Sequence, residues 1–388
     1  MFNIAALGRG NGIHKILNQE GAKHMSVTTS VRRAATIFSV LAAAGIHTAN
    51  AQPGAQSVGF LATLGGSVST VASFNSAGGT NTVTILGTGL FQVTFPGLGN
   101  GLNSNVQVNA YNTNGHPHIC TSQGWGSSNS VDVIAYVGCF DFSGNPYSAD
   151  FSIFYQARHA APGGWLGFLW ADQPTAASYT PNTNWNYNNR GTLNTVTRSG
   201  TGVYTATFPN LRGGGNPQVT AYSSGGAAAH CEISSWTARG ATTEVGVLCF
   251  DGHGNPADEY YSLSYNRSAL ESEGATNGVY GYAFKPSASS YTPRFYYSEY
   301  GGLYPTAQRQ RVFGFPLYSF VVSDPNNNTV SPIVGMVTAV GTGGEYCEVE
   351  GYDDVGGLGY FDMNLACYDS QERQINARYS AAMFYNVH

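Results

Sequence analysis

Six cysteines are the residues of this 388-residue chain whose spacing points most directly to chemistry. They form three couples, in which the partners lie 19, 18 and 20 residues apart. An even number of cysteines in an exported chain is typical of a disulfide framework, and regular couples favour pairing between nearest neighbours. We therefore predict three disulfides, which are Cys120–Cys139, Cys231–Cys249 and Cys347–Cys367.

Metal coordination is the other chemistry open to cysteine and histidine. Zinc sites need ligands two to four residues apart, but the only local candidate is His116-Pro-His118 before Cys120, matched later by His230 alone. Residues 141–145 and 251–255 alternate oxygen-bearing side chains as calcium loops do, yet no glutamate follows at the twelfth position. Turns stabilised by aspartate explain these segments better. We predict neither a metal nor a cofactor.

Catalytic motifs are absent from the sequence. It contains no Gly-x-Ser-x-Gly elbow, no His-Glu-x-x-His, no Walker loop and no complete Gly-x-Gly-x-x-Gly after a strand. The neighbouring acids Asp258/Glu259, Glu348/Glu350 and Asp353/Asp354 show no sign of converging, and we expect them at solvated edges or turns. The sequence favours a protein that is not an enzyme and designates no catalytic residue.

An aromatic residue recurs five positions after the first cysteine of each couple. A flat ring near a loop end can stack on a sugar while neighbouring Asn and Ser side chains bond its hydroxyls, although a core aromatic packed against the disulfide would show the same spacing. The ligand-binding prediction rests on Trp125, Trp236 and Tyr352.

Three functions follow from these residues. The first is a secreted, non-catalytic protein that binds extracellular glycans or a cell-surface polymer through repeated aromatic sites. The second is a passive structural or adhesive surface protein. The third is a secreted hydrolase with a site unique to the last part of the chain.

The cysteine couples lie within an internal repeat. Residues 87–96 and 200–209 share the pattern Gly-Thr-Gly…Phe-Pro, at an offset between 110 and 113 residues that holds throughout both copies. The third copy is degenerate, and Tyr291-Thr-Pro293 marks its beginning. We predict repeats at 52–160, 161–275 and 276–388.

Alternating residues and closely spaced turns predict an all-β fold without helices. We expect three tandem β-sandwich-like repeats of about 110 residues, each with one internal disulfide. The alternative is a six-bladed β-propeller with two blades per repeat. If each disulfide joins the open end of an antiparallel hairpin, the turns fall at Asn129–Ser130, Gly240 and Gly357.

The first 51 residues resemble a secretory signal peptide. Arg32 and Arg33 precede an apolar run from Ala34 to Ile46, and Ala49-Asn-Ala51 offers a cleavage site. Translation can begin at Met1 or at Met25. We predict removal of residues 1–51 and a secreted protein, with the periplasm as another location.

Charge excludes two classes of partner. Residues 52–388 contain twelve basic and 21 acidic side chains, a net charge of −9, which opposes binding to nucleic acid or to an anionic membrane surface. No apolar run reaches the roughly 18 residues that a membrane span requires.

Overall fold

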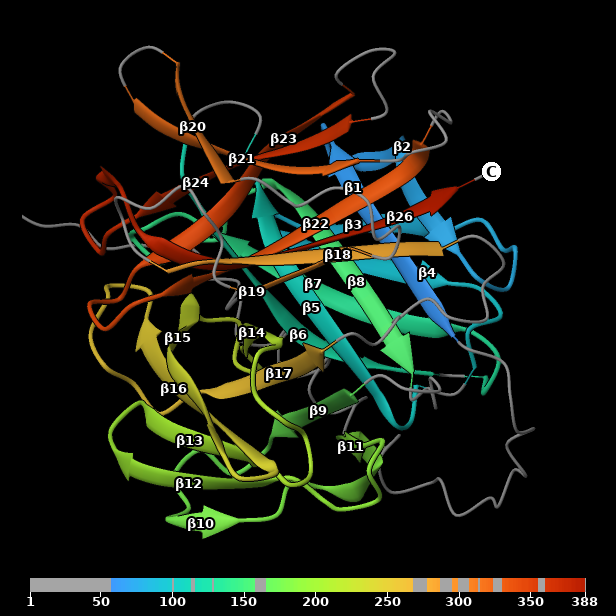
Figure 1. Ribbon diagram of the computed structural model, residues 1–388. Coiled ribbons are helices and arrows are strands. Elements are labelled where there is room, and N and C mark those ends of the chain that lie inside the picture. The colour runs from blue at the N-terminus through green and yellow to red at the C-terminus, as the bar shows by residue number, and fades with distance from the viewer. Residues whose placement is uncertain are drawn as a thin grey trace, which may run out of the picture. The chain divides into compact units, whose positions relative to one another are not determined.

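The structure, a computed structural model, describes residues 57–99, 101–112, 116–127, 129–157, 165–267, 278–286, 295–298, 307–312, 315–323, 330–354 and 360–387. Most of these residues are in strands (Figure 1). The described residues contain no α-helix, and their one helical turn is the short 3₁₀ helix η1 (Thr183–Trp185). The all-β prediction is confirmed. The predicted leader, the turn at Gly357 and Tyr291-Thr-Pro293 lie outside the described residues.

The strands follow the period-two pattern that the sequence shows. In β13 (Val203–Phe208) the side chains of Tyr204, Ala206 and Phe208 are buried, while those between them are half-buried or exposed. Alternate side chains of a strand lie on opposite faces, so one face of β13 contributes to the core.

The strands form three sheets, two with nine strands and one with eight. In order across the first sheet they are β2 (Ser67–Asn75), β1 (Val58–Leu64), β8 (Asp150–Ala157), β5 (Ser104–Tyr111), β23 (Tyr346–Asp354), β24 (Tyr360–Tyr368), β21 (Phe315–Ser323) and β20 (Ala307–Val312), with β25 (Gln374–Ile375) beside β24. The second sheet runs β10 (Ser178–Tyr179), β12 (Thr195–Gly200), β13, β16 (Thr242–Asp251), β15 (Ala229–Arg239), β22 (Val330–Val340), β26 (Arg378–Val387), β18 (Gly278–Lys285) and β19 (Phe295–Ser298). The third runs β11 (Asn186–Asn188), β9 (Trp165–Ala171), β17 (Tyr260–Arg267), β14 (Asn216–Tyr222), β6 (Ile119–Gly126), β7 (Val133–Phe140), β4 (Leu90–Phe95) and β3 (Thr82–Gly87).

Each sheet combines strands from two parts of the chain, which we call the first third (57–157), the middle third (165–267) and the last third (278–387). Parallel pairs join the thirds: β5 with β23 at Tyr111 and Val349, β14 with β6 at Tyr222 and Ser122, and β15 with β22 at Ile233 and Val340. The other pairings are antiparallel and stay within one third. The described strands therefore do not form the six four-stranded sheets of the propeller alternative.

All three predicted disulfides are present, each across an antiparallel hairpin with 4.0–4.1 Å between Cα atoms. The turns expected at Asn129–Ser130 and Gly240 lie between β6 and β7 and between β15 and β16. Ser130 and Gly240 have φ angles of 61° and 65°, in the left-handed region that tight turns use. Each hairpin also shifts register by one residue just after the disulfide.

Three large apolar cores each contain one disulfide. The core of the first third includes Cys120 and Cys139, that of the middle third Cys231 and Cys249, and that of the last third Cys347 and Cys367. Among the described residues, no helix is long and apolar enough to span a membrane.

Candidate functional site

Trp125, the first aromatic residue predicted to bind ligand, lies inside the protein. Its side chain is 4% exposed, and its indole N–H donates to Ser104 Oγ at 2.9 Å. Its ring meets Trp170 and Tyr222 of the middle third edge-on, with centroids 6.4 and 6.1 Å away. Trp125 thus packs where the first third meets the middle third.

Tyr352 and Trp236 are half-buried and also lie at contacts between thirds. The Tyr352 hydroxyl accepts from the Gly335 backbone N–H at 2.7 Å and lies 3.1 Å from Ser152 Oγ of the first third. Trp236 packs edge-on against Phe284 of the last third, with centroids 4.5 Å apart. The structure does not bring the three predicted aromatics together, but each of them touches the next third.

Two buried glutamates that the sequence did not single out as site residues also lie at these contacts. Glu232 and Glu348 directly follow the first cysteine of their couples, and both are 0% exposed. The expectation of a solvated edge for Glu348 is therefore wrong. Thr121 occupies the corresponding place in the first third and is buried as well.

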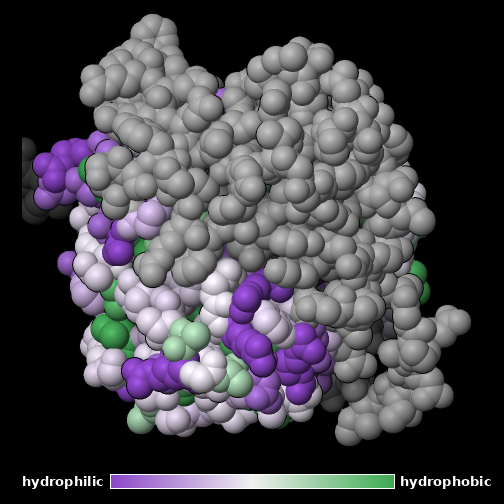
Figure 2. Space-filling model, in the orientation of Figure 1, coloured by the Kyte–Doolittle hydropathy of each residue, from purple (hydrophilic) through white to green (hydrophobic). Residues whose placement is uncertain are grey.

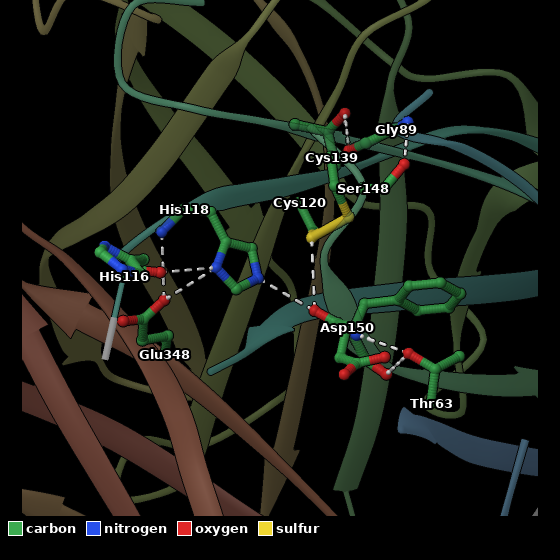
Figure 3. Close-up of a disulfide and its surroundings, with 12 residues drawn as sticks. Thr63, Gly89, His116, His118, Cys120, Cys139, Ser148, Asp150 and Glu348 are labelled. Atoms are coloured by element: carbon green, nitrogen blue, oxygen red, sulfur yellow. Dashed lines mark hydrogen bonds and ion pairs between the residues drawn. A yellow bond between two sulfur atoms is a disulfide. The ribbon is translucent and has the colours of Figure 1, made fainter. Parts of the chain in front are cut away.

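Glu348 reaches from the last third into the loop between β5 and β6 of the first third (Figure 3). Asn112 Nδ2 donates to its Oε1 at 2.7 Å, and the His118 backbone N–H donates to its Oε2 at 3.4 Å. The His118 ring lies between the carbonyl oxygens of His116 and Asp150, at 3.1 and 3.0 Å. Burial raises the pKa of Glu348 well above its usual range and lowers the pKa of His118, so both groups favour their neutral forms.

Glu232 makes the corresponding contact between the middle and last thirds. Its carboxyl oxygens accept from the backbone N–H groups of Gly344 and Glu345, at 3.2 and 3.1 Å. Burial and the neighbouring Glu345 raise the pKa of Glu232 to about 9. Burial alone would also raise the pKa of Glu345, but hydrogen bonds from Glu232 and Gly343 N–H outweigh it and lower that pKa. The two carboxyl groups therefore share one proton at neutral pH.

A second histidine, His230, lies beside Glu232. Its Nε2 is 3.1 Å from the Gly344 carbonyl oxygen, and its ring stacks on Phe250 with centroids 5.1 Å apart. Burial lowers the pKa of His230 to about 4, so this histidine is neutral at physiological pH. The loop between β22 and β23 of the last third, residues 341–345, is thus held by the neutral imidazole of His230 and the protonated carboxyl group of Glu232.

A cavity of about 50 Å³ lies among the three thirds and is lined by residues of all of them, among them Asn109, Thr220 and Thr338. These three side chains bond across the contacts in a closed cycle. Thr220 Oγ1 accepts from the Val108 backbone N–H at 3.0 Å, Thr338 Oγ1 from the Val219 N–H at 3.1 Å, and Asn109 Oδ1 from the Val337 N–H at 2.9 Å. The cavity has room for a few water molecules but not for a substrate, since ligand pockets span about 300–1,000 Å³.

Longer polar side chains reinforce two of the contacts. Gln107 and Gln218 occupy equivalent places one residue before the valines of the cycle, and each amide donates to a serine carbonyl of the next third, Ser262 at 3.3 Å and Ser380 at 3.0 Å. At the contact between last and first thirds the place is taken by Met336, in an apolar cluster where Phe154 and Phe384 stack with centroids 3.8 Å apart. At this place the contact between the last and first thirds is apolar, whereas the other two contacts have a glutamine there.

The titratable groups form no metal site within the described ranges. No three His, Cys, Asp or Glu side chains there could hold a metal ion. The acid segments 141–145 and 251–255 form the expected turns, in which Asp141 and Asp251 accept from the backbone N–H groups of Asn145 and Asn255 at 2.8 and 2.9 Å.

Comparisons with protein-family models, with curated proteins and with solved structures find no match for this chain.

Proposed function

We propose that this protein is a non-catalytic structural protein of the cell exterior, built from three β-sandwich repeats that lock one another around a shared centre. Each third supplies one group of strands to each of two sheets. The core of the first third, for example, joins Leu61 and Ile153 of one group to Phe91 and Val137 of the other, which is the arrangement of a sandwich.

The closed cycle of hydrogen bonds around the cavity carries this proposal. The polar side chains of Asn109, Thr220 and Thr338 bond the backbone of the neighbouring third. In an enzyme, polar side chains at such a centre would face a substrate. The buried glutamates and histidines do the same with loops. When the polar side chains at the centre of a protein bond its own backbone, they stabilise the fold and are not available to a substrate.

Export is the second part of the proposal. Three disulfides in the cores form and persist in oxidising compartments, which agrees with the leader that the sequence predicts. Residues 52–388 contain one lysine, and the paired strands leave little unpaired backbone for extracellular proteases to attack. Cell fractionation should place the protein outside the cytoplasm with no free thiol.

The experiment that tests the structural role is unfolding by urea, followed separately in each third. We expect one transition for all three thirds in the oxidised full chain, and resistance to protease below that transition. Three separate transitions would contradict the interlocked arrangement. Hydrolysis of a polysaccharide or peptide by the purified protein would contradict the non-catalytic role.

Glycan binding at Trp236 is the second candidate function. Trp236 is half-buried, so part of this residue stays exposed to solvent, where an aromatic ring can stack on a sugar. A glycan array with wild type and Trp236→Ala tests this role. Loss of binding with an unchanged urea midpoint would support it, and the reverse would assign Trp236 to packing alone.

A further inference from the structure

Three arginines surround a single tryptophan at one end of the middle third. The guanidinium carbons of Arg267, Arg190 and Arg212 lie 4.3, 5.6 and 5.7 Å from the ring centroid of Trp165. Trp165 and Arg267 are half-buried, whereas Arg190 and Arg212 are exposed. Figure 2 shows hydrophilic residues gathered on the surface over β9 and β11, the strands that lie at this end.

Three clustered positive charges are unexpected in a protein whose net charge is negative. Residues 52–388 have a net charge of −9 with only twelve basic side chains, and three of the twelve converge on one ring. Like charges at this separation repel one another, and the aromatic face offsets only part of that repulsion. Within the part of the chain that the structure describes, no carboxylate forms an ion pair with Arg212 or Arg267.

Buried groups fix the backbone beneath each arginine. The Arg190 backbone N–H donates to Asn188 Oδ1 at 2.9 Å, and the Tyr265 hydroxyl donates to the Arg212 carbonyl at 2.8 Å. Arg267 lies opposite Trp165 in the pair of β17 with β9. The backbone that carries the three arginines is therefore held by hydrogen bonds and strand pairing, which lowers the entropy cost of binding.

The fold itself does not need this cluster, because the first third forms the corresponding strand pair and turn without it. Ala77 takes the place of Arg190, and its N–H donates to Asn75 Oδ1 as that of Arg190 donates to Asn188 Oδ1. Ala157 and Ser57 take the places of Arg267 and Trp165, and the Ala157 N–H donates to the Ser57 carbonyl. Gly99 follows Leu98 as Arg212 follows Leu211. Four uncharged residues thus replace the tryptophan and the three arginines.

We propose that Trp165, Arg190, Arg212 and Arg267 form a binding site for an oxyanion, a carboxylate, sulfate or phosphate group. The guanidinium fork matches such groups with paired hydrogen bonds. Trp165 acts as a positioning residue, since its ring holds the cations together. The site takes one or two anionic groups, because a long polyanion would be repelled by the negative charge of the rest of the chain.

Calorimetric titration of the full chain, purified after export, tests the site with four probes: inorganic sulfate, inorganic phosphate, trigalacturonate and an uncharged trisaccharide. We expect binding of at least one anion at one site per chain, weakened by added salt. Arg212→Ala and Arg267→Ala should each weaken it about tenfold, the loss of one charge-assisted hydrogen bond. The preferred anion identifies the source, a free ion or an acidic sugar.

Arg239→Ala is the matched control, because Arg239 is an exposed arginine of the same third that pairs with Glu244 at 2.7 Å. It should leave the affinity unchanged, and urea midpoints should show that all variants fold. Equal weakening by the control would reveal an adventitious ion only and overturn the proposal. Failure of every anion to bind, or equal binding of the uncharged trisaccharide, would overturn it too.

Discussion

Replacing Glu232 by glutamine should make the protein more stable at high pH. In the folded state Glu232 keeps its proton up to a pKa of about 9, whereas an unfolded glutamate releases it near 4.5. Between these values the folded state binds the extra proton, so the free energy of unfolding falls by about 1.4 kcal/mol per pH unit. Glutamine can accept from Gly344 N–H and donate to the Glu345 carboxylate, but it loses the bond from Glu345 N–H and does not titrate. That lost bond lowers stability equally at every pH, so the comparison rests on the slope with pH.

His230 sets the lower limit of the pH range in which this effect of Glu232 can be measured. Its pKa of about 4 means that the unfolded state binds the extra proton below pH 6.5, so this group makes stability rise with pH there and opposes Glu232. Above pH 6.5 His230 is neutral in both states. Between pH 6.5 and 8.5 the free energy of unfolding of Glu232→Gln should therefore gain at most about 3 kcal/mol relative to wild type.

Urea unfolding at pH 6.5, 7.5 and 8.5, followed by tryptophan fluorescence, measures this difference. Glu244→Gln is the control, because it makes the same chemical change at a partly exposed carboxylate that pairs with Arg239 on the neighbouring strand. Its curve should run parallel to that of wild type. If the Glu232→Gln curve is also parallel, Glu232 is ionised in the folded protein and the shared proton does not exist.

Three further substitutions test the packing and the hydrogen-bond cycle by urea unfolding. Changing Cys231 and Cys249 together to alanine should lower the free energy of unfolding by about 3 kcal/mol, and an unchanged value would mean that this disulfide does not restrain the unfolded chain. Trp125→Ala should cost about 3–5 kcal/mol because the side chain is 4% exposed, and a cost near zero would remove Trp125 from the core. Thr338→Val should cost about 1–3 kcal/mol because it leaves Val219 N–H and Gln218 Oε1 without a partner, whereas the exposed Thr237→Val should cost little; equal costs would argue against the cycle.

Local features of the hairpins could be predicted from the sequence. Antiparallel pairing makes the residue numbers of partners add to a constant, so two cysteines on facing strands determine the turn, as Cys231 and Cys249 do for Gly240. The parallel contacts between thirds could not be found in this way. Each involves a single pair of residues, such as Tyr111 and Val349, and so imposes no period on the sequence. The glutamines at positions 107 and 218 were the available signal, since each is a polar residue recurring inside a strand.

The aromatic positions show how a register shift of one residue moves a side chain to the other face of the sheet. Five residues is an odd number, so in a regular strand Trp125 would lie on the face opposite Cys120. The register shift between Ser122 and Gly124 adds one residue, and Trp125 returns to the face of the disulfide and joins its core. A sequence gives no direct sign of such a bulge, and an aromatic residue on the wrong face looks like a binding site.

Glu232 and Glu348 were missed for a reason of a different kind. Each directly follows a cysteine that faces the core of its own third, so its side chain must lie on the outer face of that third. For an isolated sandwich a glutamate there is ordinary surface. It becomes buried only because the loop of the next third covers that face, and the cost of burying the carboxyl group is met by backbone donors and a retained proton. Burial that arises when folded parts associate has no signature within either part, and so a buried carboxyl group was the feature least accessible to reasoning from one repeat at a time.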